Sequence, residues 1–192
     1  MLGPLHLFVF FGLFSPGPNV ILLTTSGARF GFARSLPHVF GVALGCGIIA
    51  GLTGVGVGAL LKAAPILKLA LQVIAAGWIA TMAWKLWQSA SAPQAADRDR
   101  PFTFFEAVLF QWVNPKIWAI ALAASAYVVD QSPVAGALAL ATAFSGINLG
   151  VCLFWSFAGS LLAYLLKNPL AWVIFMRVMA CLLAASAVMV FL

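Results

Sequence analysis

The chain has 192 residues, of which 64% are hydrophobic and only 7% are charged, and its formal net charge is +6. Soluble domains carry roughly a quarter charged residues, so this composition excludes a soluble globular protein and indicates an integral membrane protein. The basic residues are spread over loops and segment ends, as orientation in a bilayer requires, and nucleic-acid binding is not predicted. The three cysteines lie in apolar segments without a CxxC pattern, so no metal, cofactor or redox chemistry is expected.

Six apolar segments are long enough to cross a bilayer, which takes about 20 residues each: 4–26, 38–61, 66–88, 103–127, 133–162 and 169–191. We therefore predict an all-α integral membrane protein with six transmembrane helices, forming one domain over residues 1–192. The stretch 89–100 has soluble-loop character and separates a half of about 1–88 from a half of about 101–192. With three helices each, two related halves would insert in opposite orientations, as two inverted three-helix repeats.

The first segment is interrupted by Ser-Pro-Gly-Pro-Asn at residues 15–19. Proline inside a helix costs about 3 kcal/mol and glycine about 1 kcal/mol relative to alanine. In hydrocarbon a broken backbone survives only where protein or water receives its polar groups. We expect a helix broken at Pro16, Gly17, Pro18 and Asn19 that faces a polar cavity, with a simple proline kink as the alternative. No basic residue precedes the apolar run and no cleavage site follows it, so a signal peptide is not predicted.

The fourth segment carries a second interruption, Asn114-Pro115-Lys116. A lysine at a helix centre costs about 2.5–3.5 kcal/mol, which makes a functional role the default interpretation. Lys116 lies roughly 20 Å from either end of its segment, too far for its ammonium group to reach the membrane surface. Interrupted helices at corresponding positions of two halves point to a transport site near the midplane. No carboxylate is expected near Lys116, so removal of its charge is expected to favour folding.

The two interruptions together suit a zwitterionic ligand. The half-helix that begins at Pro18 would expose amide hydrogens and the positive end of its dipole, which favour an anionic group. Lys116 would add a positive charge. Backbone carbonyls freed by the prolines, with the side-chain oxygens of Asn19 and Asn114, would accept hydrogen bonds from an ammonium group. A free amino acid is the simplest ligand of this kind.

Two further segments carry patterns of their own. The second segment, GVALGCGIIAGLTGVGVGALL, has glycines four residues apart, beginning with Gly41 and Gly45, and this spacing favours close helix packing. In the fifth segment, FSGINLG places Ser145 and Asn148 in apolar surroundings. These two side chains either line the cavity or bond to neighbouring helices.

The distribution of basic residues predicts the orientation of the chain. The second and fourth loops hold only Lys62 and Lys68, whereas the first, third and fifth loops hold Arg29, Arg34, Lys85, Arg98, Arg100 and Lys167. Because basic residues concentrate on the cytoplasmic side, both termini are expected outside the cytoplasm.

In order along the chain, SPGPN, the basic stretch GARFGFARS, the Gly-rich segment and FQWVNPKIW resemble the LysE/RhtB family of amino-acid exporters. With AWKLWQS, they look most like the branch that exports cysteine and O-acetylserine. The resemblance implies an inner-membrane carrier that expels amino acids or their derivatives, driven by the proton gradient. The chain differs from many members by Cys46 in place of Asp and by Ala180 in place of Gly. The family motifs match Pro16, Gly17, Pro18, Asn19, Asn114, Pro115, Lys116, Gly41 and Gly45.

We therefore expect a secondary exporter of small amino acids that works by alternating access. Its partners would be the amino-acid substrate and the lipid bilayer, with a homodimer left open. A passive channel for small zwitterions is the alternative, and saturable efflux would separate the two. An intramembrane enzyme is not predicted, because Ser145 lacks the Gly-x-Ser-Gly setting of a rhomboid-type protease and His38 starts a helix beside a basic loop.

Overall fold

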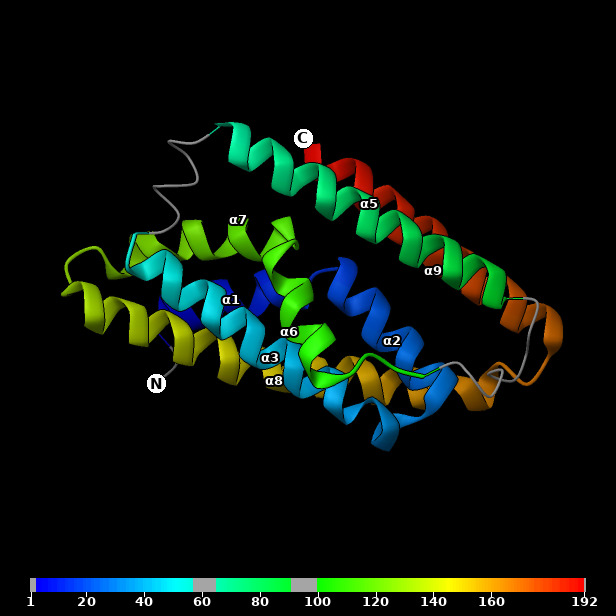
Figure 1. The fold of residues 1–192 in the computed structure, drawn as a ribbon. Coiled ribbons are helices and arrows are strands. Elements are labelled where there is room, and N and C mark those ends of the chain that lie inside the picture. Colours follow the sequence, from blue (N-terminus) through cyan, green and yellow to red (C-terminus); the bar gives the residue numbers. More distant parts are fainter. Residues whose placement is uncertain (1–2, 57–64, 91–99, 192) are drawn as a thin grey trace.

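The computed structural model describes residues 3–56, 65–90 and 100–191, and the regular structure in these ranges is helical (Figure 1). The expected loop at 89–100 and the side chains of Lys62, Lys68 and Arg98 lie outside what is described. The helices are α1 (Pro4–Phe14), α2 (Pro18–Phe30), α3 (Phe32–Gly54), α5 (Pro65–Ser89), α6 (Phe104–Trp112), α7 (Pro115–Ala124), α8 (Pro133–Leu165) and α9 (Pro169–Val188). Short 3₁₀ turns follow α7 (Ser125–Val128) and α9 (Met189–Phe191).

Proline is the first residue of α1, α2, α5, α7, α8 and α9. At this position the missing amide hydrogen would have had no partner within the helix, and the fixed φ angle already suits the helix. Pro18 and Pro115 therefore begin new helices rather than distorting continuous ones. In these two segments one helix ends before the proline and a new helix begins at it, so neither Pro18 nor Pro115 carries the energetic penalty of a proline inside a helix.

Within the described residues, the predicted segments lie where helices form. The predicted end of the first segment and the predicted start of the second were wrong. The expected basic loop between them is reduced to Gly31, since α2 continues to Phe30 and α3 begins at Phe32 instead of residue 38. Gly31 has a φ of +81°, a conformation that side chains rarely tolerate, and its amide donates to the carbonyl of Gly27. A single glycine thus ends α2, and His38 lies inside α3 rather than at its start.

Among the described residues, four helices are long and apolar enough to cross a membrane by themselves, and two bent pairs pass the same test as units. The pairs are α1 with α2, bent by 59°, and α6 with the segment Pro115–Val128, bent by 66°. If each pair is one span, the described residues hold up to six spans. The two bends are the two interruptions predicted from the sequence.

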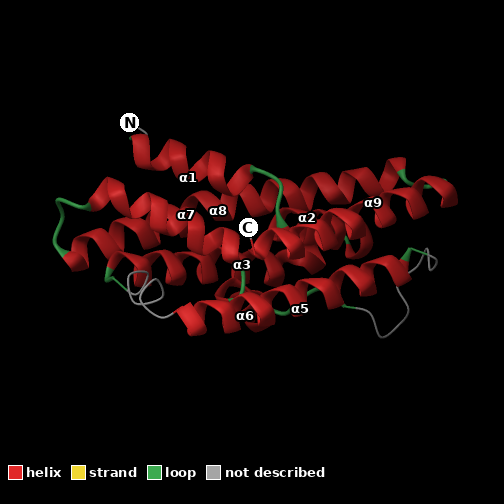
Figure 2. Ribbon diagram, turned by 90° about the horizontal axis from the view of Figure 1, so that it is seen from above, coloured by secondary structure: helices red, strands yellow, loops and turns green. Residues whose placement is uncertain are grey.

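The helices form a body and an attached pair. In the body, α8 packs against α3, α2 and α1, and α6 packs against α3. Helices α5 and α9 pack on each other and lie along one side of this body (Figure 1). Buried contacts of Ile21 and Phe110 with Ile79 and Leu183 join the pair to the body. Seen from above, the long helices run in roughly the same direction (Figure 2), as expected for a membrane bundle.

The glycines of α3 allow close approach to two neighbours. A Cβ atom on Gly45 would lie 2.7 Å from the Cγ atom of Gln111, and one on Gly41 would meet the backbone of Phe104 and the side chain of Ala107, all in α6. Further along, Gly47, Gly51 and Gly54 face α8 instead. The expected packing role of Gly41 and Gly45 therefore has a defined partner, the first half of the second broken span.

Gly27 of α2 and Gly159 of α8 let these two helices approach closely. Gly159 can be compared with a second glycine of α8 that makes no such contact. A Cβ atom on Gly159 would collide with the backbone carbonyl of Thr24, whereas one on Gly150 in the same helix would meet nothing within 4 Å. We expect Gly159→Ala to lower the melting temperature in detergent by roughly 5 °C or more, because two backbones must separate. Gly150→Ala should leave it unchanged or raise it slightly, since alanine favours a helix. Equal melting temperatures for the two variants would contradict this close approach.

Candidate functional site

Ser15, Pro16 and Gly17 form the first break, between α1 and α2. Gly17 is fully extended, with φ 175° and ψ −178°, a conformation open to any residue. Its small size has a different explanation, because a Cβ atom there would lie 2.8 Å from the Cδ atom of Lys116. The lysine side chain from the second broken span crosses directly over the backbone of the first.

Lys116 reaches the end of α1. Its ammonium group donates to the backbone carbonyl of Ser15, to the Ser15 Oγ atom at 2.9 Å and to the Pro16 carbonyl at 3.2 Å. The carboxyl end of a helix carries partial negative charge, so the contact is favourable. Among the described residues no carboxylate pairs with Lys116, but the carbonyls freed by the break receive its ammonium group, so removing the charge is no longer expected to favour folding. In this conformation they are bound by Lys116 rather than open to a ligand.

The second break lies between α6 and α7 at Val113 and Asn114. The Trp118 ring nitrogen donates to the carbonyl of Trp112 at 3.0 Å and satisfies one of the carbonyls at the end of α6. Asn114 is only 1% exposed, and its side chain makes no capping bond to α7. This leaves the amide side chain of Asn114 free to act away from its own helix.

Gln111, which is fully buried, joins the two breaks. The Asn19 side-chain amide donates to Gln111 Oε1 at 2.8 Å, and Gln111 Nε2 donates back to Asn19 Oδ1 at 3.2 Å. Gln111 Nε2 also donates to the carbonyl of Ala107 at 2.9 Å. Asn114 Nδ2 and Cys46 Sγ approach the same Oε1 atom at 3.4 and 3.5 Å. One side chain thus connects α2, α3, α6 and the start of α7.

Gln111 is not among the site residues predicted from the sequence. A signal was present, because an amide in an apolar segment must find a partner. Gln111 also precedes Asn114 by three residues, a spacing that places side chains on one face of a helix. What could not be read from the chain was its pairing with Asn19, which lies 92 positions away.

A cavity of about 10 Å³, room for one water molecule at most, lies where the two broken spans meet α8. Because it is too small to admit an amino acid, we call it the closed cavity. Three polar atoms at its wall have no hydrogen-bond partner among the described residues: Asn114 Oδ1, Asn148 Nδ2 and Trp155 Nε1. Asn148 is only 2% exposed. Buried polar groups are nearly always hydrogen-bonded, so two unused donors and one unused acceptor around one cavity make it the candidate ligand site.

Most of the predicted site residues come together at this cavity. Pro16 contributes its carbonyl to Lys116, and Pro18 and Pro115 begin α2 and α7. Ser145 and Asn148, left undecided by the sequence, separate: Ser145 packs against Gly47 of α3. Among the residues described, no group of His, Cys, Asp or Glu side chains could hold a metal ion. The predicted residues that line the cavity are Gly17, Asn19, Asn114, Lys116 and Asn148.

Both new half-helices begin at the cavity. No side chain caps the start of α2 or of α7, and the cavity wall includes Asn19 and Val20 from α2 and Lys116 and Ile117 from α7. Uncapped helix starts present amide hydrogens and partial positive charge. Two such ends and one lysine make the cavity electropositive and suited to an anionic group.

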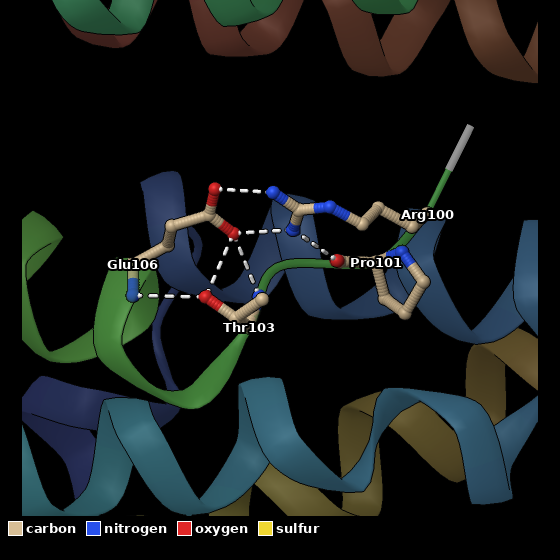
Figure 3. Close-up of polar contacts among 4 residues, drawn as sticks. All are labelled: Arg100, Pro101, Thr103 and Glu106. Atoms are coloured by element: carbon tan, nitrogen blue, oxygen red, sulfur yellow. Dashed lines mark hydrogen bonds and ion pairs between the residues drawn. The ribbon is translucent and has the colours of Figure 1, made fainter. Parts of the chain in front are cut away.

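The start of α6 is held by a separate polar cluster (Figure 3). Arg100 donates to both carboxylate oxygens of Glu106 at 2.6 and 2.7 Å, and these contacts raise the pKa of Arg100. Thr103 and Glu106 form a capping box, in which each side chain bonds to the backbone amide of the other residue. The Thr-x-x-Glu pattern could have predicted this helix start from the sequence.

Comparison with known proteins gives a matching family and several relatives. A family model described as LysE type translocator matches residues 10–192. The membrane protein PA4757 of Pseudomonas aeruginosa is 32% identical over 117 residues, which cover 56% of this chain and 54% of that protein. The chain thus spans about half the length of this relative. No solved structure matches.

A second relative aligns over a longer stretch. The cysteine/O-acetylserine efflux protein of Escherichia coli strain K12 is 28% identical over 160 residues, which cover 80% of both chains. Because the family model covers nearly the whole chain, including both breaks, this multi-pass membrane protein belongs to the LysE type translocator family and is a transporter rather than an enzyme.

Proposed function

We propose that this protein is a secondary exporter of small zwitterionic amino acids in a bacterial cytoplasmic membrane. The observation that carries the proposal is the closed cavity at the two breaks, with Lys116 beside it and three polar atoms without partners. The name of the Escherichia coli relative, a cysteine/O-acetylserine efflux protein, supports substrates of that size. A cavity with room for one water molecule at most favours a carrier over a static pore, since a pore needs an opening wide enough for the substrate.

The proposed binding mode follows from charge. The substrate carboxylate would lie at the uncapped starts of α2 and α7, beside the Lys116 ammonium group. The unpartnered Asn114 Oδ1 atom would accept a hydrogen bond from the substrate ammonium group. Asn148 Nδ2 and Trp155 Nε1 would donate to the carboxylate or to a polar side chain. The cavity must expand to admit a substrate, because it now has room for one water molecule at most.

We further propose that transport is by alternating access between two inverted halves, each with one broken helix. The substrate carboxylate would compete with the carbonyls of Ser15 and Pro16 for Lys116. Its binding would release the end of α1 from the start of α7 and allow the two halves to move. Coupling to the proton gradient is part of this proposal by resemblance to the family.

Efflux of a panel of labelled amino acids from cells that overexpress the protein tests the function. We expect saturable export of neutral amino acids such as cysteine and serine. Linear export that never saturates would support a channel instead, and export of no amino acid would remove the proposal.

The proposed orientation gives a separate prediction. The end of α5 and the turn between α8 and α9 lie at one end of the molecule, and the N-terminus and the turn between α7 and α8 lie at the other (Figure 1). Because basic residues mark the first of these ends, we expect both termini outside the cytoplasm. Reporter fusions at the C-terminus and within residues 89–100 should report opposite sides. A cytoplasmic C-terminus would contradict the arrangement with six spans.

A further inference from the structure

A second cavity, of about 610 Å³, opens between α2, α3, α5 and the start of α6. We call it the vestibule. It is much larger than the closed cavity, and its wall includes Arg29, His38, Lys85, Arg100 and Glu106. These residues belong to the end of the molecule that the proposed orientation places in the cytoplasm.

His38 is the unusual member of this wall. It lies in α3 with only 2% of its surface exposed, and neither ring nitrogen has a hydrogen-bond partner among the described residues. Its ring lies against that of Phe102, with centroids 5.0 Å apart. A buried imidazole always has one nitrogen that donates and one that can accept while it is neutral. Because buried polar groups are normally paired and His38 lines the vestibule, the unused ring nitrogens are candidates to bind a ligand there. Both nitrogens are shielded in this conformation, so the His38 ring or its neighbours must move for a ligand to reach them.

The charges around the vestibule favour a carboxylate. Arg29 of α2, Lys85 of α5 and Arg100 are cationic, and Glu106 is the one carboxylate among the described residues of the wall. Glu106 is bound by Arg100 and Thr103 and is not available to a ligand. The charges of Arg100 and Glu106 cancel in their ion pair. Lys85 therefore leaves the vestibule wall with a net positive charge even if Arg29 is not counted. Such a field attracts carboxylates and repels cationic side chains.

We propose that the vestibule is a second binding site, which takes the carboxylate of the outgoing amino acid through a hydrogen bond from the His38 ring and rejects amino acids with cationic side chains. This inference rests on the proposed export function and narrows its substrates to neutral and acidic amino acids. The site would hold the substrate before it reaches the closed cavity.

The vestibule and the closed cavity are arranged for such a passage. His38 and Cys46, which contacts Gln111, are eight residues apart in α3, a rise of roughly 12 Å. The Phe102 ring, which contacts His38, also contacts the ring of Phe110, with centroids 6.2 Å apart. Phe110 directly precedes Gln111 and is fully buried. Phe102 lines the vestibule, and on the proposed route these two rings would have to move as the substrate passes.

Counterflow of L-cysteine, kept reduced, into inverted membrane vesicles tests the site, because the cytoplasmic face is then accessible. Four variants of the full chain separate the roles. His38→Phe keeps a ring against Phe102 but removes both nitrogens, and His38→Gln keeps a donor and an acceptor. Lys85→Glu reverses a charge of the vestibule wall. Lys167→Glu is the control, an exposed lysine at the α8–α9 turn outside that wall.

We expect His38→Phe to raise the KM for cysteine about tenfold or more, the loss of one hydrogen bond to a charged group. His38→Gln should stay within about threefold of wild type, on the same argument that a hydrogen bond is kept. L-Lysine should be a poor competitor of L-cysteine for the wild-type protein and for Lys167→Glu. It should be a markedly better competitor for Lys85→Glu.

An unchanged KM in His38→Phe, with normal counterflow, would overturn the vestibule site and leave the export function standing. If His38→Gln fails as completely as His38→Phe and the remaining transport loses its pH dependence, His38 carries a proton and does not bind a carboxylate. Equal inhibition by lysine in wild type and Lys85→Glu would overturn the selectivity, whether or not the His38 variants fold. Wild-type vesicles without saturable counterflow would remove the export function itself, and the vestibule site with it.

Discussion

Lys116→Met is expected to raise the KM for export at least tenfold and also to lower the stability of the protein. The substrate carboxylate loses a charge-assisted hydrogen bond, a contact of about 1.5–3 kcal/mol, and each 1.4 kcal/mol is roughly tenfold in affinity. Stability falls because the ammonium group binds Ser15 and the Pro16 carbonyl at the end of α1. Initial rates of efflux and melting in detergent measure the two effects separately.

Lys167→Met is the matched control for this variant, since it removes a lysine that is exposed at the turn between α8 and α9. It should change neither export nor melting. Lys116→Arg should keep part of the activity, because the charge remains while its geometry differs. Wild-type export by a correctly inserted Lys116→Met protein would show that the substrate carboxylate is held by helix amides alone. A more stable Lys116→Met protein would contradict the contacts with α1.

Gln111→Leu is expected to destabilise the protein by about 1–3 kcal/mol and to abolish most of the export. The substitution leaves the side chain of Asn19, which is partly buried, without its amide partner, and a polar group left unpaired in the interior costs stability through its desolvation. Asn114 and Cys46 lose a neighbour at the same time. Export falls because Gln111 sets the distance between the two breaks around the closed cavity.

The double variant Asn19→Leu with Gln111→Leu separates stability from transport. Removing both partners leaves neither member of the Asn19–Gln111 pair without the other, so the melting temperature should recover part of the loss seen in Gln111→Leu, although Asn114 still lacks its neighbour. Export should stay low, since Asn19 lines the closed cavity. Recovery of export together with stability would show that the amide pair only supports the fold. Additive losses of stability would mean that the two side chains do not act as a pair.

The sequence by itself determined the features that depend on local chemistry. Hydropathy places the apolar segments, because each must be about as long as the bilayer is thick. Pro18 and Pro115 mark the two breaks, because proline suits the first position of a helix and is costly in its interior. The lysine beside the second break is a candidate for function wherever it lies, since its charge is costly in hydrocarbon.

The tertiary structure decided which atoms meet across the breaks. The carbonyls that accept from Lys116 lie about 100 positions earlier in the chain, at Ser15 and Pro16. From the sequence those carbonyls were predicted to bind a substrate, because the sequence could not show that the Lys116 side chain crosses Gly17. For the same reason, the sequence could not decide whether Ser145 and Asn148 line the cavity. The orientation of α8 about its axis places Ser145 against α3 and Asn148 at the cavity. The direction of a side chain in a bundle depends on how whole helices pack, and no local pattern in the sequence specifies it.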